Sequence, residues 1–437
     1  MGARHLLFSN CGDTGAVPVT EVGASRGPVA RGSVARVGTA TALTALCGYA
    51  VIYLAARDLA PRGFSIFGVF WGAFGLVTGA ANGLLQEATR EVRSASYLGD
   101  IGAAPLGRTH PLRVAAMVGV AAAVVIAGTS PLWSARVFVE ARWLSVALLS
   151  VGLAGFCLHA TLLGMLAGTN HWTSYGALMV TDAVIRVAVA AATFAIGWGL
   201  AGFLWATVAG ATAWLITLAV SPTARAAARL LTPGDTATFL RGAAHSITAA
   251  GASAILVMGF PVLLKLTSTD LGAEGGVIIL AVTLTRAPLL VPLTAMQGNL
   301  IAHFVDERSD RLRALVRPAA IIGGVGALGV LAAGLIGPWL LRVFFGPQYQ
   351  ASSALLAWLT AAAVAIAMLT LTGAATVAAA LHRAYALGWV GATVASGLLL
   401  LLPLPLQTRT VVGLLCGPLV GIGVHLVALA RAGRLTG

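Results

Sequence analysis

The chain has 437 residues, of which 58% are hydrophobic and 9% are charged, and its formal net charge is +13 at pH 7. These proportions lie far from those of a soluble globular domain, so water is not the main solvent of the fold. The positive charge does not indicate a nucleic-acid partner, because it is spread over short segments between long apolar stretches.

Twelve apolar stretches are each long enough to cross a bilayer as a helix, since a hydrocarbon core about 30 Å thick needs about 20 apolar residues. The pattern therefore predicts an all-α integral membrane protein with twelve transmembrane helices. In chain order, the predicted spans are residues 36–56, 64–86, 114–133, 143–167, 174–197, 199–220, 240–264, 275–299, 316–336, 352–380, 384–403 and 410–430.

The basic residues predict which ends of these helices face the cytoplasm. Of the 27 Lys and Arg residues, eighteen lie before the first span, after the last, or in the even-numbered gaps, and seven lie in the odd-numbered gaps. Positive charge beside membrane helices stays cytoplasmic, so both termini are expected there. Arg186 and Arg286 are left inside predicted spans. The excess of Arg over Lys, with abundant Ala and Gly, hints at a GC-rich bacterium, and we expect its inner membrane to hold the protein.

An even number of helices on each side of a central gap predicts two six-helix lobes related by a parallel pseudo-two-fold axis. The expected domains are an amino-terminal tail without fixed structure (1–35), an amino-terminal lobe (36–220), a cytoplasmic linker (221–239) and a carboxy-terminal lobe (240–437). The linker reads equally well as a surface helix on anionic lipid or as a plain basic loop.

Two helices carry packing signals. Gly68, Gly72, Gly75, Gly79 and Gly83 line one face of the second predicted helix, which allows another helix to approach closely and is compatible with a moving gate. The eighth helix contains two prolines that remove backbone donors and free carbonyls one turn earlier, so this helix is expected to face the interior of the protein; they are Pro288 and Pro292.

Buried ionisable groups are the best functional candidates in a membrane protein. Arg286 lies near mid-bilayer beside Pro288, where its guanidinium suits a phosphate or diphosphate, or else ties down carbonyls of a neighbouring helix. Arg186 stands one turn after Asp182, so a self-neutralising ion pair is the leading interpretation, with Asp182 as a proton site the sharper alternative. Among the histidines, His245 is the candidate relay to test first.

Motifs for enzymatic chemistry are absent from the sequence. Lys265 is the single lysine and lies between two leucines, so there is no Walker lysine, and no HExxH or histidine cluster offers a metal site. We therefore expect neither an enzyme nor a bound cofactor, and transport driven by a gradient or by substrate supply is what remains.

Four segments carry a resemblance to a known family. Residues 64–93 resemble the second helix of bacterial polysaccharide flippases, which belong to the multidrug/oligosaccharidyl-lipid/polysaccharide exporter superfamily. Residues 259–264 and 285–289 are similar to its seventh and eighth helices, and residues 344–349 to the loop before its tenth helix. The resemblance covers nearly the whole chain after residue 35.

The resemblance implies two lobes around a central cavity, with alternating access. The implied cargo is an undecaprenyl-diphosphate-linked saccharide, exported to the outer leaflet with glycan assembly enzymes as further partners. Helices 1, 2, 7 and 8 would line the cavity, which puts Arg286 there and leaves Arg186 and Asp182 in the amino-terminal lobe. The chain departs from the family in having twelve helices, where many polysaccharide members have fourteen.

Three alternatives stay open at this point. A drug or cation antiporter of the same superfamily fits the fold, although that branch usually relies on more intramembrane acid than Asp182. A glycan polymerase or ligase would need a large outer loop with acidic or arginine clusters, and the sequence has none. A non-transporting component of a glycan assembly complex would have no cavity.

Overall fold

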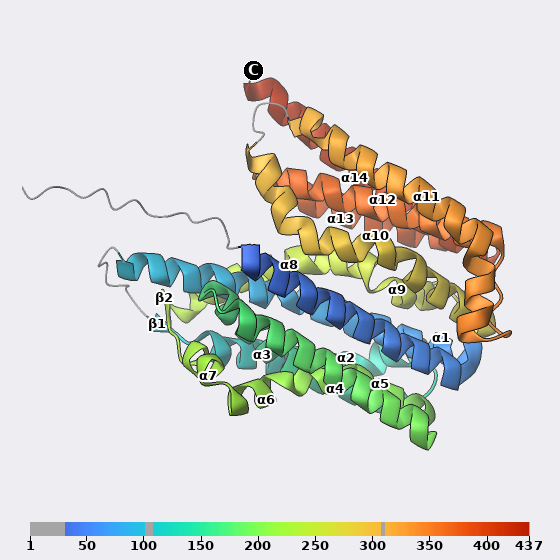
Figure 1. Cartoon of the computed structure of the whole chain (residues 1–437), viewed down its shortest axis with the longest axis horizontal. Coiled ribbons are helices and arrows are strands. Elements are labelled where there is room, and N and C mark those ends of the chain that lie inside the picture. Colours follow the sequence, from blue (N-terminus) through green and yellow to red (C-terminus); the bar gives the residue numbers. More distant parts are fainter. Residues whose placement is uncertain (1–30, 101–107, 307–310, 437) are drawn as a thin grey trace, which may run out of the picture.

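The structure is a computed structural model that describes residues 31–100, 108–306 and 311–436. It is a bundle of long helices with one pair of two-residue strands (Figure 1). The tail expected over residues 1–35 lies outside the described residues, except that residues 31–35 already belong to the first helix. The predicted class, an all-α membrane protein with two lobes, is confirmed.

The amino-terminal lobe begins with α1 (Arg31–Asp100), a helical hairpin that reverses direction at Ala60 (Figure 1). Ala60 has φ 51° and ψ 173°, and Pro61 starts the returning arm, because the residue before a proline is driven away from helical geometry. The remaining elements of this lobe are α2 (Pro111–Val137), α3 (Arg142–Gly168), α4 (Trp172–Ile196), α5 (Gly199–Ala209), the 3₁₀ turn η1 (Gly210–Thr212) and α6 (Ala213–Val220).

A short linker joins the two lobes. It holds the helix α7 (Pro222–Ala228), capped by the hydroxyl of Ser221, and the strand β2 (Thr232–Pro233), which pairs antiparallel with β1 (Arg108–Thr109). A helix was one of the two interpretations of this basic segment. Its contact with anionic lipid stays a prediction.

The carboxy-terminal lobe begins with a bent pair of helices. These are α8 (Thr236–Val257) and α9 (Phe260–Leu266), which meet at 67° and together make one pass. Asp235 caps the start of α8 by accepting the backbone N–H of Thr238. The other elements are α10 (Gly272–Asp306), α11 (Arg311–Phe345), α12 (Ser353–Ala378), α13 (His382–Leu400) and α14 (Leu406–Thr436).

Within the described residues, nine helices are long and apolar enough to cross a membrane, and ten if the α8–α9 pair counts as one span. Since α1 contains two passes and α13 adds a less apolar one of 19 residues, the described chain crosses twelve times. The chain enters α1 and leaves α14 at the same end of the bundle (Figure 1). This is the arginine-rich end, where Arg36, Arg90, Arg241 and Arg431 lie.

One prediction about the middle of the chain was wrong in detail. The seventh helix, expected to run unbroken over residues 240–264, is interrupted after Val257, because Gly259 and the proline two residues later start a new helix. The eighth helix continues past Pro288 and Pro292 as part of α10. The break therefore lies in α8–α9, and α10 packs beside it.

Candidate functional site

The two lobes meet along the glycine face of α1. A Cβ added at Gly72 would lie 3.0 Å from Pro261 of α9, and one added at Gly79 would lie 2.7 Å from Ala254 of α8. In the same way, Gly75 meets Met258 at the end of α8, and Gly83 meets the backbone of Ile247 within α8. Gly68 meets Ile279 of α10. We call this contact the glycine seam. The helices approach closely along this face, and the partner of α1 there is the other lobe.

At the arginine-rich end, a buried carboxylate closes the seam. Glu87 of α1 is 1% exposed, and its Oε1 lies 2.6 Å from Nη2 of Arg90. The same carboxylate lies against α8, where it touches Gly242, so that a Cβ at this position would overlap it. Glu87 and Arg90 of the amino-terminal lobe thus meet the carboxy-terminal lobe at α8.

At the opposite end, an aromatic cluster ties the lobes together. Tyr349, fully buried in the loop after α11, donates its hydroxyl to the carbonyl of Ala56 in α1 at 3.0 Å. Its ring also lies edge-on to Phe64 of α1, with centroids 6.2 Å apart, and to Phe345 of α11, and Phe345 in turn contacts Tyr53. We call these residues the aromatic tie.

Arg286 lies behind the glycine seam, against the break between α8 and α9. Its Nη1 donates to the carbonyl of Val257 at 3.0 Å and, more weakly, to that of Leu256 at 3.4 Å. Those carbonyls end α8 and have no partner in their own helix, because the helix stops there. The guanidinium carbon also lies 5.4 Å from the centre of the Phe260 ring. Nη1 of Arg286 therefore makes the kind of contact that the sequence suggested as one alternative, a tether to free carbonyls of a neighbouring helix.

The other half of this guanidinium has no partner. Arg286 is 8% exposed, and its Nη2 is buried without a hydrogen bond among the described residues. No ion pair in the described part of the chain involves Arg286. An unpaired cation within a membrane span is costly, and it is the kind of group that a phosphate satisfies.

The second buried cluster lies inside the amino-terminal lobe. Nε and Nη2 of Arg186 donate to the carboxylate of Asp182 at 3.0–3.2 Å, and Nη1 donates to the carbonyl of Thr207 at 2.7 Å. Gly210 in η1 leaves room for this pair, since a Cβ there would overlap the Asp182 carboxylate. The leading interpretation of the sequence, a self-neutralising pair, agrees with this geometry.

The remaining candidates lie apart from one another. His245 is exposed on α8, with Nδ1 2.7 Å from the carbonyl of Arg241 in its own helix. His159 of α3 is 3% exposed, and its Nδ1 has no partner among the described residues. Pro288 and Pro292 are exposed on α10, and Pro288 faces a cavity. The structure therefore brings Asp182 together with Arg186, and leaves Arg286 and His245 separate.

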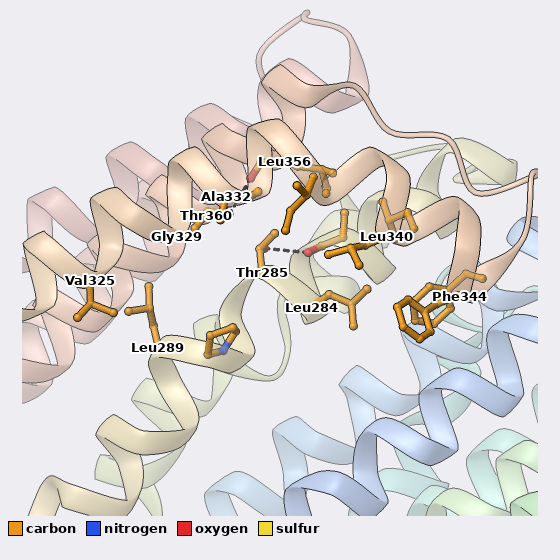
Figure 2. Close-up of a pocket in the computed structure, with 17 residues that line it drawn as sticks. Leu284, Thr285, Leu289, Val325, Gly329, Ala332, Leu340, Phe344, Leu356 and Thr360 are labelled. Carbon is orange, nitrogen blue, oxygen red and sulfur yellow. Dashed lines mark hydrogen bonds between the residues drawn. The ribbon is translucent and has the colours of Figure 1, made fainter.

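A cavity of about 500 Å³ lies between α10, α11 and α12 (Figure 2). It is inside the carboxy-terminal lobe, and Arg286 does not line it. The lining side chains are apolar or small, with two threonines.

Sequence reasoning missed the helix break and the ring of Phe260 that lies beneath Arg286. The signal was present in the order Gly259, Phe260, Pro261, because a proline at the first turn after a glycine marks a helix start. Tyr349 was noted in the sequence, but its bond to Ala56 joins residues 293 positions apart and has no local signal.

Comparison with known proteins defines the class. No protein-family model matches the chain. The structure is similar to a multidrug resistance MATE family transporter of the MOP superfamily in its inward-facing conformation, with TM-score 0.71 and 16% identity, over 90% of this chain and 96% of that chain. For the outward-facing conformation of such a transporter, the TM-score is 0.61 at 14% identity, over 92% and 96%. The chain thus has the fold of MATE transporters.

Its relatives in sequence are mycobacterial. The chain is 82% identical over 431 residues to uncharacterized protein Mb3654 of Mycobacterium bovis, which covers 99% of both chains. It is 81% identical to uncharacterized protein Rv3630 of Mycobacterium tuberculosis, again over 99% of both, and 73% identical to Rv1510 of the same strain, over 95% of this chain and 96% of that one. The chain belongs to this family, which includes Rv3630 and Rv1510 of one Mycobacterium tuberculosis strain.

Proposed function

We propose that the protein is a transporter that moves a polyprenyl-diphosphate-linked saccharide across the inner membrane by alternating access, with its arginine-rich end in the cytoplasm. The observation that carries this proposal is the buried guanidinium of Arg286, which has a free Nη2 and no carboxylate partner among the described residues. A diphosphate supplies the missing negative charge and accepts two hydrogen bonds in the geometry that a guanidinium offers.

Access to Arg286 requires a movement of the bent helix pair. Nη2 of Arg286 is buried behind the break between α8 and α9, and the other face of this break packs on Gly72 and Gly75 of α1. Separation of the lobes along the glycine seam removes α1 from this break and lets a diphosphate approach.

The pairing of Asp182 supports an anionic cargo over a cationic one. Asp182 lies within a span, and Arg186 already neutralises it through three hydrogen bonds. Binding an organic cation there would require breaking this pair, which is costly in a medium of low polarity.

A second candidate, a drug or small-cation antiporter, is favoured by one observation. Solved structures with this fold include multidrug resistance transporters. In that case Asp182 is the exchange site, and its protonation would release Arg186. A membrane component of a glycan assembly complex is the remaining candidate, and it requires no movement at the seam.

The deciding experiment is a leaflet assay in a mycobacterial strain that lacks both family members. Lipid-linked saccharides would be quantified in right-side-out and inverted vesicles with a membrane-impermeant glycosidase. We expect the saccharide to accumulate on the cytoplasmic leaflet, and this chain to restore export when it is returned to the strain.

Two other results would contradict the proposal. An unchanged leaflet distribution with greater sensitivity to cationic drugs would assign the chain to the antiporters. An unchanged distribution with impaired polymer length would assign it to the assembly complex.

The orientation is tested separately, with a reporter enzyme that is active only outside the cytoplasm. Fused to residue 57 or residue 350, at the end opposite the arginine-rich one, this reporter is expected to be active.

A further inference from the structure

The cavity between α10 and α11 forms a groove along one face of α11. Its α11 lining runs from Val325 to Phe345 at helical spacing, which corresponds to about 30 Å of helix, close to the thickness of a hydrocarbon core. The opposite wall is α10, from Ala281 to Leu289, and Leu356 and Thr360 of α12 form the floor. Figure 2 shows the side chains of these helices turned toward one another across the space.

The groove has no group for a polar ligand. None of its seventeen lining residues is charged, and both hydroxyls are already used within their own helices. The hydroxyl of Thr285 donates to the carbonyl of Ala281 at 2.8 Å, and that of Thr360 to the carbonyl of Leu356 at 2.8 Å. The lining therefore favours an apolar occupant.

The groove opens to the bilayer, because side chains on its rim are half exposed. Val325 is 52% exposed, Ile336 is 51% exposed and Phe344 is 52% exposed. Both walls belong to membrane-spanning helices, so the medium at this rim is lipid and the occupant is a chain that enters from the membrane.

Shape must select among lipid chains here, since the bilayer solvates apolar surface as well as a groove does. Gly329, Ala332 and Ala333 present little or no side chain on this face of α11, and larger side chains such as Leu340 lie beside them. Such notches gain van der Waals contact from a chain that carries methyl branches at intervals, and gain less from a straight acyl chain.

The groove is continuous with the contact between the lobes. Phe345 lines its end and also belongs to the aromatic tie, where its ring lies 5.8 Å from that of Tyr53 in the other lobe. Along α10, Thr285 of the groove directly precedes Arg286, so groove and guanidinium lie at the same depth on different faces of one helix.

We propose that this groove binds the polyprenyl tail of the transported lipid, while the headgroup is carried between the lobes. This inference rests on the proposed function and adds to it a second site, for the tail. It keeps the long chain in the membrane beside α11 during transport, so that the lobes need only accommodate the diphosphate and the saccharide.

The test is photocrosslinking on the full chain in phosphatidylglycerol nanodiscs. The probe is a polyprenyl monophosphate with a diazirine on its terminal isoprene unit, and labelled peptides are mapped by mass spectrometry. We expect labelling of α10 and α11 that unlabelled polyprenyl phosphate suppresses and excess phosphatidylglycerol does not.

Matched variants on α11 test the place. In Gly329→Leu the new side chain fills the groove, since a Cβ there lies 3.5 Å from Thr360 and meets nothing else within 4 Å, and we expect labelling to fall about tenfold. Gly324→Leu, the same change where an added Cβ meets nothing within 4 Å, is expected to leave labelling unchanged. Ala332→Leu is a second groove variant. The competition with unlabelled polyprenyl phosphate is measured on the wild-type chain, so it does not depend on how the variants fold.

The outcomes separate the two proposals. Suppression by phosphatidylglycerol would make this a groove for bilayer lipid and overturn the inference. The tail site would be overturned, while the proposed cargo stands, by either of two results. The probe could label other helices but not α10 or α11, or Gly329→Leu and Ala332→Leu could leave the labelling intact. No suppressible labelling anywhere on the chain would overturn the polyprenyl cargo itself, and the tail site with it.

Discussion

Arg286 combines two roles that a single side chain rarely holds in a membrane. One nitrogen of its guanidinium satisfies the carbonyls that the end of α8 leaves open, and the other is buried without a partner in the described structure. The first role maintains the bend of the helix pair, and the second leaves a positive charge for a ligand. Arg409 differs in that both of its terminal nitrogens have partners, the carbonyls of Thr267 and Leu400 and the hydroxyl of Ser268, and only its inner Nε is buried without one.

Replacing Arg286 by lysine is expected to separate these roles. A lysine keeps the charge and can still reach one carbonyl, but it cannot form the paired hydrogen bonds to a diphosphate. We expect Arg286→Lys to keep its thermal unfolding midpoint close to that of the wild type while saccharide export falls about tenfold. The control is Arg409→Lys, which should lower the midpoint and spare export. Equal losses of stability and export in both variants would make Arg286 purely structural.

The Asp182 and Arg186 pair is expected to behave as a structural unit. Removing one member leaves a buried charge uncompensated, so Asp182→Asn or Arg186→Met should each destabilise the protein by about 3–5 kcal/mol. The double variant removes both charges and should recover most of that loss. We would measure unfolding midpoints in one detergent and saccharide export in cells. A double variant that folds but no longer transports would assign the pair to coupling, as the antiporter candidate requires.

At the scale of elements, α1 is the centre of the molecule. Its first arm packs in the amino-terminal lobe, and its second arm presents the glycine seam to α8, α9 and α10. The sequence predicted the seam from glycine spacing alone, because periodicity along one helix is a local property. It did not identify the partner, since α8 lies over 150 residues further along the chain and carries no matching glycine row.

Side-chain size on α1 offers a direct check of the seam. In Gly83→Ala the added methyl would overlap the backbone of Ile247, which a rotamer change cannot relieve, so a loss of about 1–3 kcal/mol in stability is expected. Gly48→Ala on the first arm meets nothing within 4 Å and should be neutral or slightly stabilising. Thermal unfolding of both variants in the same detergent gives the comparison. Similar midpoints for the two would show that the lobes do not meet at Gly83.

On the scale of the whole molecule, α10 turns away from the first arm of α1 toward the arginine-rich end (Figure 1). The aromatic tie holds the lobes together at the other end. An opening on the opposite side requires the aromatic tie to separate.

Tyr349→Phe is expected to weaken the aromatic tie without emptying its place in the core. It removes the hydrogen bond to Ala56 while the ring contacts remain, and a loss of about 1 kcal/mol favours the outward-open state by about fivefold. Spin labels at Arg57 and Gln350, on either side of the tie, should report a larger population at long distance in the variant. Distance distributions identical to those of the wild type would show that this bond does not hold the outer end closed.

Hydropathy, charge and glycine spacing determined the class of fold, the position of nearly every span and the closely packed face of α1, because each of these is written in residues close together along the chain. Arg286 also emerged from the sequence, as a charge that topology left over. Only the tertiary structure decided what these features meet: the carbonyls of α8 under Arg286, the other lobe behind the glycines, and Ala56 beside Tyr349. Such contacts depend on helices that lie far apart in sequence, where no local pattern carries a signal. The α10–α11 groove arises for the same reason, since it is the space that three separate helices leave open.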